Sequence, residues 1–115
     1  MERVRALIRR VGGHTASVNY RYLELAVEAE LRTRYLRHSL TSQVKRLYQI
    51  ISEEQGVRAD RISRGVARAV ADLWDHGDRE ELEKAVGHRL LEKPYPNELI
   101  FDLAAHLDEK RSVGA

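Results

Sequence analysis

Four arginines recur at short intervals in the segment GVRADRISRGVARAVADLW, residues 56–74. They are Arg58, Arg61, Arg64 and Arg68. Intervals of three, three and four residues place their side chains on one face of a helix. The apolar residues of the segment fall on roughly the opposite face, and they are Ile62, Val66, Val70, Leu73 and Trp74. A guanidinium group donates paired hydrogen bonds in one plane, so this basic face could bind phosphate groups or read the edge of a guanine base.

The same face is also explained as an ordinary solvent-exposed surface. Asp60 precedes Arg64 by four residues. Asp72 likewise follows Arg68 by four. Ion pairs at this spacing stabilise exposed helices by about 0.2–0.5 kcal/mol each. The pattern alone slightly favours the solvated interpretation and leaves the binding interpretation open.

Length and composition are those of one small globular domain. The chain has 115 residues, of which 43% are hydrophobic and 33% charged, and this mixture suffices for a buried core. It contains no cysteine, which excludes disulfides and thiolate zinc sites. No apolar run approaches the roughly 18 residues of a membrane span, and MERVRALIRR lacks the apolar core of a signal peptide. We therefore expect a cytoplasmic protein with no membrane partner.

The basic residues are concentrated in the first two thirds of the chain. Residues 1–40 carry eight Lys and Arg against four Glu, a charge of +4, and residues 41–76 carry six basic against five acidic residues, a charge of +1. Residues 77–115 carry six basic against nine acidic residues, a charge of −3, and the three parts sum to the net charge of +2. Phosphate would repel the last third, so we expect that third to face away from any nucleic acid.

Helical spacing of apolar residues along the whole chain predicts an all-α fold. The expected helices cover residues 2–11, 18–37, 41–54, 59–75, 79–86 and 97–110. The expected N-caps are Ser17, Ser39 or Thr41, Asp78 and Asn97. We expect Gly12-Gly13 to end the first helix, Gly56 to adopt the left-handed conformation of a turn, and residues 111–115 to fray.

The third and fourth predicted helices, joined at Gly56, have the outline of a helix-turn-helix. In such a motif the second helix buries one face and presents its first turns to the major groove. Arg58, Arg61 and Arg64 occupy those first turns. Carboxylates stand further along the same face, at Asp72 and Asp75, so only the N-terminal part of the helix can approach DNA.

The segment ADRISRGVARAVADLWDHG, residues 59–77, resembles the recognition helix in the family of stage 0 sporulation protein A effector domains, the DNA-binding part of a sporulation initiation response regulator. The positions that fit there are Ala59, Arg61, Ile62, Arg64, Val66, Ala69, Val70, Trp74 and Gly77. Matches elsewhere are Gly12, Tyr20, Tyr22, Leu23, Leu47-Tyr48, Lys93-Pro94, Glu98, Ile100, Ala104 and Leu107. The resemblance covers residues 8–107, with small length changes near 32–40 and 88–92.

The resemblance implies a six-helix domain that binds a short box of double-stranded DNA, often as tandem copies on neighbouring boxes. It implies that Arg61 and Arg64 read bases. Two other positions that face DNA in the family carry different side chains here, with Asp60 where the family has serine and Ser63 where it has glutamate. Ala67 replaces a family arginine, and Arg68 stands one step further on, so the preferred box could differ. For phosphate we expect contacts from three nearby basic residues, Arg58, Lys45 and Arg46.

These 115 residues show no receiver domain with an aspartate pocket. We therefore expect one helical domain over residues 1–115, without the phosphorylation control that the family has. Met1 and the helix after it are typical of a native start, which favours a free-standing DNA binder. A piece of a longer protein is the second possibility. The third is a protein-interaction module on the same fold that modulates a full-length regulator, or associates with itself, without reading DNA.

Other chemistry has little support. The five histidines include no pair at ligand spacing, and the cluster Asp75-His76-Gly77-Asp78 is better explained by helix capping than by metal or acid–base work. The serines have no evident base partner, so we expect neither an enzyme nor a small-molecule substrate, cofactor or metal. Trp74 and the tyrosines at 20, 22, 35 and 48 are at helical spacing and are expected in the core, which also disfavours RNA binding on an aromatic platform.

Overall fold

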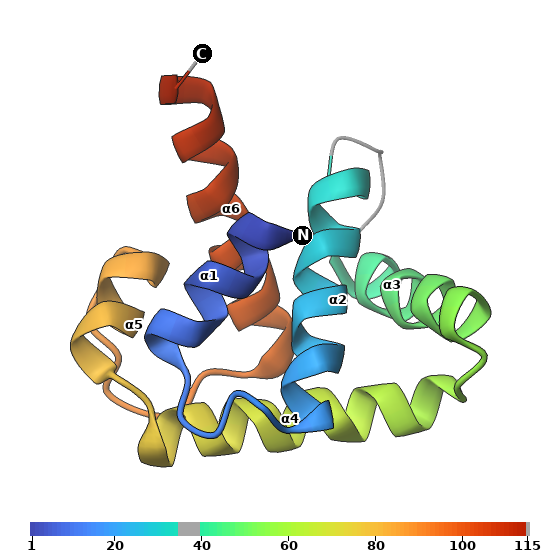
Figure 1. The fold of residues 1–115 in the computed structure, drawn as a ribbon. Helices are drawn as coiled ribbons and strands as arrows, with labels where there is room; N and C mark the ends of the chain where they lie inside the picture. The colour runs from blue at the N-terminus through green and yellow to red at the C-terminus, as the bar shows by residue number, and fades with distance from the viewer. Residues whose placement is uncertain (35–39, 115) are drawn as a thin grey trace.

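The structure, a computed structural model, describes the backbone of residues 1–34 and 40–114 and the side chains of residues 1–34 and 46–108. The described part of the chain is built from helices and contains no strand, which confirms the prediction of an all-α fold (Figure 1). The helices are α1 (Glu2–Val11), α2 (Val18–Thr33), α3 (Leu40–Gln55), α4 (Ala59–His76), α5 (Arg79–Val86) and α6 (Pro96–Gly114).

Three local signals in the sequence place helix ends correctly. Ser17 caps α2, because its side chain accepts a hydrogen bond from the backbone N–H of Asn19 at 3.2 Å. Asp78 caps α5 in the same way, with the N–H of Glu81 at 3.1 Å. Gly56, which follows α3, has a φ of +66°, a conformation that glycine adopts without strain.

Helix α2 ends earlier than predicted, at Thr33 rather than residue 37. The hydroxyl of Thr33 donates a hydrogen bond to the carbonyl oxygen of Ala29 at 2.9 Å. No glycine or proline in the sequence marks this end of the helix. Residues 35–37 lie outside the described part of the chain. So does Ser39, one of the two proposed caps of α3. Thr41, the other, is within α3 and is not its cap.

Helix α6 begins at Pro96, so the prediction that Asn97 caps it is wrong. The carbonyl of Tyr95 instead accepts the first hydrogen bond, from the N–H of Leu99 at 3.0 Å. Proline suits the first helical position because it has no N–H to satisfy and its φ is already helical. Helix α6 extends to Gly114, past the predicted end at residue 110.

Helix α2 is the centre of the packing and contacts α1, α3, α4 and α6. Its Leu23, Ala26 and Val27 are fully buried, in one core cluster with apolar residues from the other five helices. Helix α4 crosses one end of α2 and runs along the lower edge of the molecule in Figure 1, where no other helix covers its outer face. The fold therefore presents one long face of α4 at the surface.

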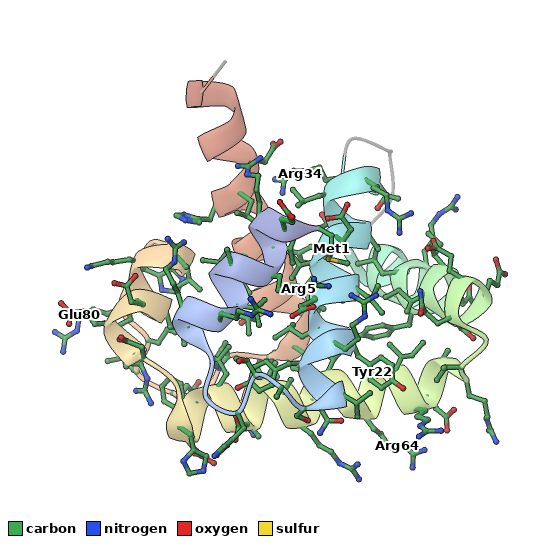
Figure 2. The ribbon with its side chains drawn as sticks, viewed as in Figure 1. Met1, Arg5, Tyr22, Arg34, Arg64 and Glu80 are labelled. Atoms are coloured by element: carbon green, nitrogen blue, oxygen red, sulfur yellow. The ribbon has the colours of Figure 1, made fainter. Side chains whose placement is uncertain are left out.

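The crossing of α2 and α4 depends on Gly65. A Cβ atom added at Gly65 would lie 2.4 Å from Cδ2 of Tyr22, a ring that is buried between the two helices. Figure 2 shows Tyr22 reaching from α2 toward α4. The absence of a side chain at Gly65 thus lets α2 approach the half of α4 that carries the arginines.

Candidate nucleic-acid interface

Helix α4 separates its two faces as the spacing predicts. The residues buried on the inner face are Ile62, Gly65, Val66, Ala69, Val70 and Leu73. The four arginines are all exposed, and the side chains of Arg58 and Arg64 retain 87% and 68% of their accessible surface. Figure 2 shows Arg64 pointing away from the rest of the molecule. Trp74, at the inner edge, is only half-buried and lies under the guanidinium group of Arg79, 3.3 Å from the ring centroid.

A tight turn joins the end of α3 to the start of α4, which carries the arginines. The N–H groups of Gly56 and Val57 both donate to the carbonyl of Ser52, at 2.9 and 3.3 Å, and close the end of α3. The backbone is extended at Arg58, and α4 starts at the next residue. This arrangement of α3, turn and α4 confirms the predicted helix-turn-helix outline.

Asp60 connects two of the four arginines. Its Oδ1 lies 3.3 Å from Nε of Arg58, and its Oδ2 lies 3.4 Å from Nη2 of Arg64. The sequence predicts the second pair from its i,i+4 spacing but not the first, because Arg58 reaches Asp60 only through the extended backbone that precedes the helix. All three side chains are more than half exposed, so each pair contributes little to stability.

Arg61 and Arg68 differ from the other two arginines. Within the described side chains neither has an ion-pair or hydrogen-bond partner. Both line a hollow of about 400 Å³ between α4 and the start of α2, together with Arg64 and the α2 residues Asn19 and Tyr22. No carboxylate lines this hollow. The contribution of α2 was not predicted, since the two helices meet only through tertiary packing and the sequence carries no spacing signal for it.

The opposite edge of the α4 face carries one acidic residue, Asp60. Ser63 is half-buried there, and it lines a second hollow of about 250 Å³ with Asp60 and with Tyr48 and Gln49 of α3. Arg46 of α3 is exposed, whereas the side chain of Lys45 lies outside the described ones. Four of the residues predicted to contact bases are exposed on α4, and they are Asp60, Arg61, Arg64 and Arg68. Ser63, the fifth, is half-buried, and Arg58, predicted to contact phosphate, is exposed just before the helix begins.

The second predicted ion pair, Arg68–Asp72, does not form. Asp72 instead holds the loop between α1 and α2: Oδ2 accepts hydrogen bonds from the N–H of His14 at 2.8 Å and the hydroxyl of Tyr20 at 2.7 Å, and Oδ1 lies 2.7 Å from Nδ1 of His14. Burial alone would raise the pKa of Asp72, but these contacts lower it to about 2. Two donors of His14 in the loop and the hydroxyl of Tyr20 in α2 thus satisfy the carboxylate, and Arg68 is left free toward the hollow.

The histidines near this loop make no metal site. The rings of His14 and His76 lie edge to face with their centroids 5.1 Å apart. Across the described residues, no three His, Cys, Asp or Glu side chains are grouped so that they could hold a metal ion.

The fold and the face together define a class: an all-α domain with a helix-turn-helix whose second helix exposes a row of arginines. The family described as the sporulation initiation factor Spo0A C-terminal domain matches residues 4–107, and this chain belongs to that family. The family is the DNA-binding effector domain of a sporulation regulator, which supports double-stranded DNA as the partner. A search of curated proteins finds no match. Among the described residues, no helix has the length and apolar character needed to span a membrane.

Proposed function

We propose that this domain recognises a specific sequence in duplex DNA by placing the first turns of α4 in the major groove, as a transcription regulator does. The observation that carries the proposal is the exposed arginine face itself. Arg61 and Arg64 stand within the first two turns of α4, and the inner face of the same helix is fixed in the core. A helix held in this way can insert its N-terminal turns without disturbing the fold.

The residues proposed to contact DNA have distinct roles. Arg61 and Arg64 read bases, because a guanidinium group can donate two hydrogen bonds to the O6 and N7 atoms of guanine. Asp60, Ser63 and Arg68 face the bases beside them. Arg58, Arg46 and Lys45 contact phosphate and fix the register of the domain on the duplex. Neighbouring boxes could hold tandem copies of the chain.

The distribution of charge supports this orientation. The acidic residues of α5 and its cap are Asp78, Glu80, Glu81 and Glu83. Figure 2 shows Glu80 on the outer side of α5, far along the molecule from Arg64. With α4 toward DNA, this acidic surface is directed away from the phosphates that would repel it.

The test is fluorescence anisotropy with two labelled duplexes over a series of salt concentrations. One duplex is enriched by the wild-type chain from a randomised pool, and the other is a scrambled version of it. We expect tighter binding to the enriched duplex, with affinity that falls steeply as salt rises. Arg64→Ala should reduce the preference for the enriched duplex by at least about fivefold, because a bidentate base contact is worth about 1–3 kcal/mol.

Arg10→Ala is the matched control. It removes the same charge from a residue that lines a hollow between α1, α5 and α6, where α4 contributes nothing. We expect this variant to keep the sequence preference. Equal binding of the wild type to both duplexes would refute sequence-specific reading and would favour the interaction module, which keeps the fold and binds a protein.

A further inference from the structure

Asp60 is an acidic residue in the middle of a surface proposed to meet phosphates, and this position needs an explanation. Its carboxylate lies between Arg58 and Arg64, with one oxygen 3.3 Å from the first and the other oxygen 3.4 Å from the second. More than half of its surface is exposed, so the fold does not require the charge to be there.

We propose that Asp60 is a specificity-determining residue that acts by positioning Arg64. The inference rests on the proposed function and goes beyond it. Asp60 holds the guanidinium group of Arg64 over the first turn of α4, so that Arg64 meets one base pair in a restricted orientation. At the same time its negative charge weakens binding to DNA that offers only phosphates.

The geometry of the contact allows this role. Only Nη2 of Arg64 approaches Asp60, so the other nitrogens of the guanidinium group remain free to donate. A side chain already held in place loses less conformational freedom when it binds, which favours the base that fits the held orientation. On unrelated DNA no such base is present, so no base contact by Arg64 offsets the repulsion between the carboxylate of Asp60 and the phosphates, and binding is weaker.

The same helix provides a matched control for charge. Asp75 is exposed, and it has no ion-pair partner among the side chains that the structure describes. Asp60→Asn and Asp75→Asn each remove one negative charge from the outer face of α4, but only the first removes the carboxylate that contacts Arg58 and Arg64. Asp60→Glu keeps a carboxylate at the i,i+4 position and can restore the contact.

The experiment measures dissociation constants for the enriched duplex, the scrambled duplex and a set of duplexes with single base-pair changes. We expect Asp60→Asn to bind the scrambled duplex more tightly and to reduce the preference for the enriched duplex by about twofold, the change that loss of one exposed i,i+4 contact allows. The loss should be confined to the base pair at which Arg64→Ala also loses discrimination. Asp75→Asn should tighten binding to every duplex alike, and Asp60→Glu should keep the preference of the wild type.

Three results overturn the inference. One is that Asp60→Asn tightens binding to all duplexes by one common factor, as Asp75→Asn does. The second is a loss of discrimination at base pairs other than the one assigned to Arg64. The third is a wild type that distinguishes no duplex from another, which refutes the proposed function as well, whereas the first two leave that function standing.

Discussion

Replacing Asp72 with Asn should make the domain less stable at neutral pH and should remove part of its acid sensitivity. Asp72 is the carboxylate that holds the loop between α1 and α2 to α4, through His14 and Tyr20. An asparagine has one acceptor instead of two and presents an N–H₂ group to the donors of the loop. The variant therefore loses charge-assisted hydrogen bonds that the wild type has.

The magnitude follows from the pKa of Asp72, which lies at about 2 in the folded protein against an ordinary value of 3.8. A difference of about 1.8 pH units corresponds to at most about 2.4 kcal/mol in the free energy of unfolding, at 1.36 kcal/mol per unit, and solvent screening of this partly exposed contact reduces the contribution to about 1–2 kcal/mol. The pKa is lowered by folding, so this stabilisation is present above pH 4 and is lost as the pH falls toward 2. The wild type should lose it over that interval, and Asp72→Asn should not.

The assay is urea denaturation, monitored by far-UV circular dichroism at pH 7, 5, 4, 3 and 2. We expect Asp72→Asn to be about 1–2 kcal/mol less stable than wild type at pH 7, with the gap closing toward pH 2. Asp75→Asn, the same substitution at a residue with no described ion-pair partner, should follow the wild-type curve. A gap between wild type and Asp72→Asn that stayed constant from pH 7 to pH 2 would refute the assignment of Asp72 as the anchor of the loop.

Two further predictions concern packing. Gly65→Ala would place a Cβ 2.4 Å from the buried ring of Tyr22, so we expect a cost of about 1–3 kcal/mol for overpacking, partly offset by the about 1 kcal/mol that alanine gains in a helix. The melting temperature should fall by several degrees. A variant as stable as wild type would contradict the prediction, because α2 could then move away from α4 at no cost. Arg79→Ala removes the guanidinium group that lies over Trp74 and donates to its carbonyl at 2.9 Å. We expect a loss of about 0.5–1 kcal/mol and a changed emission spectrum of Trp74, the only tryptophan of the chain, whereas an unchanged spectrum would contradict the contact.

The helices were predictable because their signals are local. Apolar periodicity, the caps at Ser17 and Asp78 and the left-handed Gly56 act within a few residues, and each is visible in the sequence. The predicted helix end was wrong where a second local effect outweighed the expected N-cap. At the start of α6, proline takes the first helical position and displaces the cap to Tyr95.

The site was predictable only as a row of residues on one helix. Spacing places the arginines on one face, but it cannot show that Asp72 turns to the α1–α2 loop while Arg68 faces a hollow. Nor can it show that Asn19 and Tyr22 of α2 border that hollow, because their contact with α4 depends on the crossing at Gly65. These features come from tertiary packing between segments that are more than 40 residues apart in the sequence.

The most direct test of the central claim is to titrate the enriched duplex into the isotope-labelled chain and follow the amide resonances by NMR. If α4 reads DNA, the largest changes will fall on residues 58–68 and on the start of α2 at Val18 and Asn19. The amides of α5, on the acidic surface, will change little. Changes concentrated on α1, α5 or α6, with residues 58–68 unaffected, would contradict the account, because the arginine face would then not be the surface that meets DNA.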